Sequence, residues 1–294
     1  MKVSNFDIID EPDHSVNETL DDVSDNPLLL HTLTYNIKYP PPRTSSPTRA
    51  EKIGLCLKQV NNNYDIIALQ ECFFQIYYET IIENSKTEVS SYKYYSNIVG
   101  YPDSFLFKDS GGAVFISKWP IINEWEHVFT EHTIDDGLAR QQKGVIAVEI
   151  DKNGQHYYLV TTHTSPYEKH RDVREIQLKE MAEFINEKLI NPYPVIIMGD
   201  LNIVYGSAEE KNIYNTIPNL KYVANSGYYK YSWDPEINNL ADDDEQCTLD
   251  YLFYLDNVKH KKPLSVKANI IRPVENGSID LSDHFAIQGI FRFG

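Results

Sequence analysis

The chain has 294 residues, of which 41% are hydrophobic, and a formal net charge of −16 at pH 7. This length allows one large domain of the α/β or all-β class with a sizeable core, and no stretch approaches the roughly 20 apolar residues of a membrane span. The acidic balance argues against general nucleic-acid binding, because such a surface repels phosphate backbones. A bound divalent cation can still reverse the sign of the potential locally.

The cysteine content and the N-terminus bear on the compartment. Cys56, Cys72 and Cys247 lack the even number and paired spacing of a disulfide framework or a zinc site. The first residues contain no basic segment followed by an apolar run, so no signal peptide is predicted. A cytoplasmic location is therefore the default expectation. A processed form of a secreted or membrane-associated protein would invalidate it.

The first part of the chain alternates between extended and helical patterns. Residues 1–26 are acidic, polar and aperiodic, and we expect a flexible N-terminal arm followed by a single domain over 27–294. A long apolar and β-branched run predicts a buried strand over 28–37, and a loop rich in proline and serine follows it. The helical spacing of apolar residues predicts a helix over 47–60, and a second buried strand is predicted over 64–69.

The middle of the chain is richer in β structure. Two glycines open a predicted strand over 111–122, and residues 143–164 predict two strands joined by a tight turn at Asn153-Gly154. Residues 166–190 then carry apolar side chains on one helical stripe.

Three more strands are predicted toward the C-terminus, over 193–202, 247–255 and 284–293. Strands and helices alternate, but hairpins interrupt the alternation, which indicates mixed sheets covered by helices instead of a purely parallel Rossmann arrangement. No glycine-rich phosphate-binding loop follows a strand, which weakens the case for a nucleotide-binding fold.

Predicted strands repeatedly end or begin with a carboxylate, an amide or an imidazole. These residues are Asn36, Glu71, His163, Asp200, Asn202, Asp250, Asp283 and His284. Strand ends collect at one edge of the sheets in α/β proteins, and ligand sites lie there. Each residue alone also has a structural explanation, such as an Asx turn, a helix cap or a satisfied core histidine. The repetition of the pattern favours a functional site.

The residue types suit one reaction class. Carboxylate and amide oxygens are hard ligands of the kind that Mg²⁺ prefers. Two histidines and a spare carboxylate can supply a general base, its orienting partner and a donor to developing charge. The set fits metal-assisted attack of water on a phosphoester. It does not suit a serine or cysteine nucleophile, because no nucleophile-elbow serine or reactive cysteine accompanies it.

The motifs "TYNI", "LQE", "GDLN", "LDYLF" and "SDH", in this order, resemble the endonuclease/exonuclease/phosphatase superfamily, which includes DNase I-like nucleases, inositol polyphosphate phosphatases and neutral sphingomyelinases. The segments "GGAVFISKWPI", "KGVIAVEI", "TTHT" and "YSWDPEINNLA" are similar to the sphingomyelinase branch. The resemblance runs from about Leu28 to the C-terminus. It implies a single catalytic domain with a DNase I-like fold: a four-layered α/β sandwich, with two mixed sheets face to face and helices outside.

The resemblance also implies roles for the acidic and amide residues. Glu71 would be the main metal ligand, with Asn36 beside it, and Asp283 would support the metal or its water network. Asp200 would orient the attacking water, and Asn202 would contact the phosphate.

The remaining implied roles concern the two histidines. His284 would be the general base, with Asp250 paired to its imidazole. His163 would stabilise phosphate charge or assist the leaving oxygen, and Trp233 would shape a choline pocket by cation–π contact.

The implied function is hydrolysis of sphingomyelin, or of a related phosphocholine lipid, to ceramide and phosphocholine. The implied cofactor is Mg²⁺, with Mn²⁺ or Co²⁺ as alternatives. We expect a monomer that contacts membranes peripherally and does not bind nucleic acid. A nuclease or an inositol-phosphate phosphatase on the same scaffold is the alternative, and an inactive binding protein is a third hypothesis.

The sequence departs from secreted bacterial sphingomyelinases in one segment. Those proteins carry an aromatic β-hairpin before the final Asp-His, whereas this chain has no aromatic residue between Tyr254 and Phe285. The basic and aliphatic stretch "VKHKKPLSVKANIIRPV" stands there instead. It is either a contact for anionic headgroups or ordinary surface.

Overall fold

The structure, a computed structural model, describes residues 6–9, 25–39, 47–59, 64–86, 92–100, 110–133, 141–242 and 245–294. Its first sheet has the strand order β1 (Phe6–Ile9), β12 (Ser265–Glu275), β14 (Ala286–Arg292), β2 (Leu29–Tyr39), β3 (Ile66–Cys72), β5 (Val114–Ser117) and β4 (Tyr94–Tyr95), with β13 (Ile279–Asp280) paired to β12. Its second sheet has the order β10 (Leu220–Tyr222), β11 (Asp250–Leu255), β9 (Val195–Asp200), β8 (Gln155–His163), β7 (Gly144–Lys152) and β6 (Ile121–Val128).

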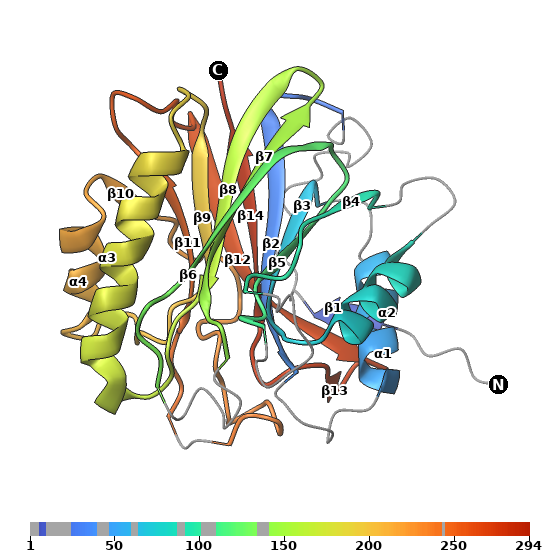
Figure 1. Cartoon of the computed structure of the whole chain (residues 1–294). Helices are drawn as coiled ribbons and strands as arrows, with labels where there is room; N and C mark the ends of the chain where they lie inside the picture. The colour runs from blue at the N-terminus through green and yellow to red at the C-terminus, as the bar shows by residue number, and fades with distance from the viewer. Residues whose placement is uncertain are drawn as a thin grey trace.

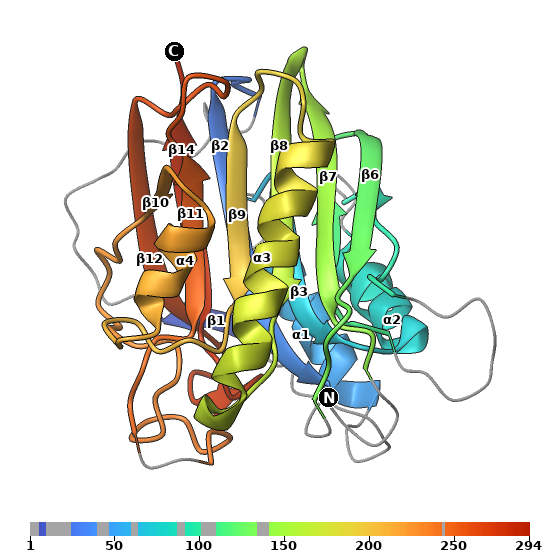
Figure 2. The same cartoon turned by 60° about the vertical axis from the view of Figure 1, so that its left-hand side comes forward.

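The two sheets pack face to face, and helices cover their outer faces (Figures 1 and 2). Helices α1 (Pro47–Gln59) and α2 (Gln75–Ser85) lie outside the first sheet. The long α3 (Arg171–Lys188) and the short α4 (Glu210–Thr216) lie outside the second, and the 3₁₀ turn η3 (Glu168–His170) leads into α3. The predicted four-layered α/β sandwich is confirmed.

Alternation along the strands builds three apolar layers. In β3, Ile67 and Leu69 join the core beneath α1 and α2, whereas Ile66 and Ala68 join the core between the sheets. A strand with both faces buried becomes continuously apolar, which explains why the sequence predicts it as a buried run. Strand β9 divides in the same way, with one set facing the first sheet (Ile196, Met198) and the other facing α3 (Val195, Ile197).

The predicted hairpin joins β7 and β8. Asn153 and Gly154 form its tip with φ of 52° and 86°, as a type I′ turn requires. Strands β2 and β3 are parallel, as are β8 and β9, while the other pairs are antiparallel, so both sheets are mixed. Among the described residues, no helix has the length and apolar character needed to span a bilayer.

The sequence predicts a flexible arm over 1–26, and the structure corrects this at one place. Phe6–Ile9 form β1, which pairs antiparallel with the end of β12, and the Phe6 ring is buried in the core beneath α1 and α2. Four residues inside an acidic segment are too few to reveal a strand by periodicity, and the pairing partner lies more than 260 positions away. Residues 1–5 and 10–24, and residues 40–46 of the predicted proline-rich loop, lie outside the described residues.

This topology brings many strand ends to one edge of the sandwich, the lower edge in Figure 1. The carboxyl ends of β2, β3, β8 and β9 lie there because each of the two parallel pairs runs toward it. The amino ends of β11 and β14 lie there because each is antiparallel to one of those strands. All the polar strand-end residues singled out in the sequence therefore meet at this edge.

Gly199, directly before Asp200, lies where β8 and β9 approach each other closely at the site edge. It has φ of 145°, and a Cβ at this position would lie 2.3 Å from the Thr162 carbonyl oxygen. We expect Gly199→Ala to lower the free energy of unfolding by about 3 kcal/mol in urea denaturation, because the new methyl group would force the backbone of β8 or β9 to shift.

Gly206→Ala is the matched control, since Gly206 also has positive φ (82°) but a Cβ at this position would meet no atom within 4 Å. It should cost about 1 kcal/mol. Equal losses for the two variants would contradict the close approach of the strands.

Candidate active site

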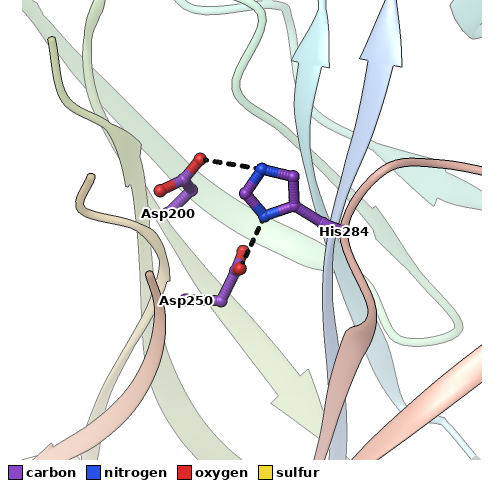
Figure 3. Close-up of side chains that lie close together, drawn as sticks. All are labelled: Asp200, Asp250 and His284. Carbon is purple, nitrogen blue, oxygen red and sulfur yellow. Dashed lines mark hydrogen bonds and ion pairs between the residues drawn. The ribbon is translucent and has the colours of Figure 1, made fainter. Parts of the chain in front are cut away.

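The imidazole of His284 lies between two buried aspartates (Figure 3). Its Nδ1 lies 2.7 Å from Asp250 Oδ2, a hydrogen bond, and its Nε2 lies 3.8 Å from Asp200 Oδ2. With an ionised Asp250, the short contact places a proton on Nδ1, so the other nitrogen faces Asp200. The predicted pairing of His284 with Asp250, and not with its neighbour Asp283, is the arrangement that the structure has.

The loop before β11 braces this pair. The Ser232 carbonyl accepts a hydrogen bond from the Phe285 amide, and the Ser232 hydroxyl accepts from the Asp250 amide. The Trp233 ring stands edge-on against the His284 ring, with centroids 5.1 Å apart. These contacts leave His284 little freedom to rotate. Trp233, predicted to shape a choline pocket, thus packs directly on the imidazole.

Asn36 connects two carboxylates. Its Nδ2 donates to Glu71 Oε1 at 3.2 Å and to Asp200 Oδ2 at 2.9 Å, and its Oδ1 accepts from the Lys38 amide at 3.0 Å. The amide nitrogen therefore faces the carboxylates. A metal-ligand role for Asn36 stays a prediction, and it requires the amide to turn its oxygen toward the site.

His163 lies on the other side of these carboxylates. Its Nε2 lies 3.9 Å from Glu71 Oε1 and 3.6 Å from Asp200 Oδ2. The Nζ of the buried Lys143 lies 3.0 Å from His163 Nε2 and 3.2 Å from Nδ1, and it donates to the Thr164 carbonyl at 2.9 Å.

Lys143 is a site residue that the sequence motifs do not predict. The hairpin register contained the signal, because a turn centred on Asn153-Gly154 pairs Val145 with Thr162 and so brings Lys143 opposite Thr164. Lys38 is not predicted either. Its Nζ lies 2.8 Å from Asp283 Oδ2, so the carboxylate next to His284 in sequence pairs with this lysine instead.

Three site residues have left-handed backbone conformations, and Lys38 is one of them with φ of 44°. Glu71 has φ of 58° and Asn202 has φ of 49°, a region that is costly for a residue with a Cβ and is enriched at functional sites. The Asn202 amide donates to Asp200 Oδ1 at 2.8 Å, and its side-chain Nδ2 donates to the Thr164 carbonyl at 3.0 Å. Asn202 thus fixes the Asp200 carboxylate and faces the loop after His163.

Burial and charge shift the pKa values strongly. Burial raises the pKa of Asp200, and the neighbouring Asp250 charge raises it further. Burial and the Asp283 charge likewise raise the pKa of Glu71, against the opposing effects of Lys143 and His284.

The two histidines shift in opposite directions. Burial, Lys143 and His284 hold the pKa of His163 well below its usual range. Burial also acts to lower the pKa of His284, but the charge and hydrogen bond of Asp250, with Asp200 and Asp283, outweigh it and raise the pKa to about 10. At neutral pH these environments favour an uncharged His163 and a protonated His284.

The donor set fits a divalent cation of the magnesium type. Asp200, Asp250 and His284 offer ligand atoms within 4.8 Å of one another, but His284 Nδ1 and Asp250 Oδ2 already bind each other. The carboxylate of Glu71 is 21% exposed, so it faces the open side of the site. Burial and neighbouring negative charge raise the pKa values of Glu71 and Asp200, and a cation is bound most favourably among hard carboxylate oxygens in such an environment. Glu71, with Asp200 and Asp283 beside it, is the set that we favour.

The sequence was compared with those of known protein families and proteins. The sequence over residues 33–284 matches the model of the Endonuclease/Exonuclease/phosphatase family. A phospholipase C of Staphylococcus aureus is 27% identical over 298 residues, which cover 90% of this chain and 85% of that protein. A sphingomyelinase C of Listeria ivanovii is 26% identical over 260 residues, which cover 77% of this chain and 75% of that protein.

A similar solved structure agrees with the observed architecture. The crystal structure of a beta toxin variant from Staphylococcus aureus with bound magnesium ions has a TM-score of 0.75 at 24% identity and covers 90% of this chain and 99% of that one. At this identity the likeness concerns the fold.

The Asp250–His284 contact gives a prediction for titration. Asp250→Asn should lower the pKa of His284 by about two units from about 10, because the amide lacks the charge that stabilises the imidazolium. Nuclear magnetic resonance of the His284 ring in EDTA measures this shift. An unchanged pKa would show that the pair does not control the imidazole.

The same shift sets a pH dependence of stability. The folded-state pKa of His284 lies above its unfolded value of roughly 6.5, so the stabilisation from its proton is fully present below that pH and is lost as pH rises through about 10. The difference in unfolding free energy between wild type and Asp250→Asn should therefore shrink over this window. A difference that grows with pH would contradict the assignment.

Proposed function

The chain belongs to the Endonuclease/Exonuclease/phosphatase family, and from this premise we propose that it is a Mg²⁺-dependent phosphodiesterase of the sphingomyelinase type. Water attacks the phosphorus of sphingomyelin, or of a related phosphocholine lipid, and the bond from phosphorus to the ceramide oxygen breaks. That oxygen takes up a proton, so the products are ceramide and phosphocholine.

The observation that carries this proposal is the buried Asp250–His284 pair facing Asp200 and, beyond it, Glu71. Asp250 fixes the imidazole through Nδ1, which leaves Nε2 to take a proton from water on the side of Asp200. Asp200 accepts hydrogen bonds from the Asn36 side chain and the Asn202 amide, so its carboxylate is held in place. A fixed carboxylate beside the base is suited to orienting the water.

The opposite side of the site suits the phosphate. Lys143 and Asn202 both donate to the Thr164 carbonyl, and Lys143 also contacts His163, whose Nε2 lies near Asp200 and Glu71. Preorganised donors of this kind stabilise charge that develops on phosphoryl oxygens. Because Lys143 is buried, its positive charge acts across a low-dielectric region and is weakly screened.

Glu71, Asp200 and Asp283 would hold the magnesium ion, which supplies Lewis-acid stabilisation of the phosphoryl oxygens when bound. A cation beside these carboxylates also opposes the positive charge on His284 and so lowers the pKa of its imidazole. That is the direction a general base requires at neutral pH. The carboxylates that would hold the cation would therefore also influence whether His284 is protonated.

The substrate class rests on the relatives. Similar proteins are named sphingomyelinase C or phospholipase C, and the acid-rich chain is poorly suited to a polyanionic nucleic acid. We further propose a monomeric protein that meets membranes peripherally. The cytoplasmic location and the organisation as one domain over 27–294 stay predictions.

The direct test is release of phosphocholine from sphingomyelin vesicles with Mg²⁺ and with EDTA. Wild type should release phosphocholine only with the metal. Glu71→Gln should raise the Mg²⁺ concentration for half-maximal rate about tenfold or more, because one ionised ligand is lost.

Glu187→Gln is the control, since the Glu187 side chain is 71% exposed on α3 and lies outside the site. It should leave the Mg²⁺ requirement unchanged. A folded, metal-supplied wild type that releases no phosphocholine, but cleaves plasmid DNA or inositol phosphates, would overturn the proposed substrate.

A further inference from the structure

Exposed apolar side chains lie on the segments that continue from residues of the candidate active site, one in a loop and one in the first turn of α2. Tyr167 follows His163 by four positions and is 62% exposed, and Ile76 follows Glu71 by five positions and is 68% exposed. Each therefore lies on the segment that continues from a site residue, at the edge where the strands of both sheets end (Figure 1).

Leu240 completes this set on the side of Asp283. It is 40% exposed, and its carbonyl accepts a hydrogen bond from Lys38 Nζ, the amine that pairs with Asp283. We call Tyr167, Ile76 and Leu240 the rim residues. They come from two loops and the first turn of α2, and follow or contact segments of His163, Glu71 and Asp283.

Tyr167 is held outward by a built arrangement. Its φ of 66° and ψ of 144° lie in a region that favours glycine. The buried guanidinium of Arg174 donates to the Tyr167 carbonyl at 2.6 Å and to the Ser165 carbonyl at 3.0 Å. Arg174 is itself fixed by a two-pronged contact with the Glu209 carboxylate, at 2.7 Å on both sides.

The hydrogen bonds from Arg174 thus hold Tyr167 in a strained backbone conformation while its ring stays largely exposed to solvent. A ring that is 62% exposed gains little burial in the free protein to offset the strain. Such an outlier points to a function for the displayed side chain. Lys169 lies with Nζ 5.6 Å from the centre of the ring, so the displayed group is amphipathic: an aromatic face with a cation above it.

We propose that the rim residues, with Tyr167 as the anchor, form the surface by which the protein contacts a zwitterionic phosphocholine bilayer. This inference rests on the proposed function, because the scissile bond of a membrane lipid lies at the interface and the residues around the site must meet it. Tyrosine is suited to that depth, since its ring is apolar and its hydroxyl stays in contact with water.

Charge selects the kind of bilayer. A chain of net charge −16 is repelled by anionic headgroups, so contact must come from apolar side chains entering a surface without net charge. Three rim residues from separate segments suit shallow contact of this kind, in which the binding scales with the apolar area that leaves water.

The first part of the basic stretch noted in the sequence, which holds Lys259, Lys261 and Lys262, lies at the other edge, whereas β12 carries the rest toward the site. The Lys261 amide donates to the Pro192 carbonyl, just before β9 begins at Val195, whereas Asp200 ends that strand. Six residues of strand separate the two positions by roughly 20 Å. These lysines therefore cannot rest on the same flat membrane as the site.

The test compares hydrolysis of a bilayer substrate with hydrolysis of a soluble one, and measures membrane binding separately. Hydrolysis is measured on sphingomyelin in phosphatidylcholine vesicles and on a water-soluble, monomeric phosphocholine ester, and vesicle binding is measured separately by sedimentation. Tyr167→Ser should lower both vesicle binding and vesicle hydrolysis about tenfold and leave the soluble ester unaffected. Tyr167→Trp should preserve both.

Ile190→Ser is the matched control, because Ile190 is 67% exposed just beyond the far end of α3, at the edge opposite the site. It should change nothing. Undiminished vesicle binding by Tyr167→Ser, or an equal loss on both substrates, would overturn the proposal, as would binding that requires phosphatidylserine. A wild type that binds vesicles through Tyr167 but hydrolyses neither substrate would instead overturn the proposed function alone.

Discussion

The hydrogen bond between Asp250 and His284 joins the two sheets. Asp250 begins β11 in the second sheet, and His284 lies two residues before β14 in the first. Asn36 spans the same seam when it donates to Asp200. The site therefore exists only where the two sheets pack together, and the apolar layer between them is what holds the base, its partner and the carboxylates in register.

Packing also sets the chemistry of these groups. The carboxylates of Asp200 and Asp250 and both imidazoles are almost completely buried, and removal of water magnifies every charge in the seam. Burial lowers the pKa of both histidines, but the charges of the aspartates around His284 raise its pKa, so His163 is kept neutral and His284 protonated. Two identical side chains thus acquire different proposed roles from their surroundings, one facing the phosphate and one facing water.

The sequence predicts the parts of this structure that depend on local pattern and motif order. Buried runs, the Asn153-Gly154 turn and polar strand ends predict mixed sheets with a functional edge, and the family resemblance carried by the motifs implies the four-layered sandwich. Contacts made by residues distant in sequence are not visible in that way. Three such contacts depend on how the chain packs after the strands are placed. They are the contact of Lys143 with His163, the amide orientation of Asn36 and the hydrogen bond from Arg174 to the Tyr167 carbonyl.

A double-mutant cycle on Asp250 and His284 tests the central claim, that this cross-sheet pair is one unit of a lipid phosphodiesterase. The quantity is kcat/KM for phosphocholine release by wild type, Asp250→Asn, His284→Asn and the double variant, all supplied with Mg²⁺. We expect His284→Asn to lose roughly 10³-fold and the double variant to lose no more, because Asp250 acts through the imidazole. Losses that multiply independently would contradict the account.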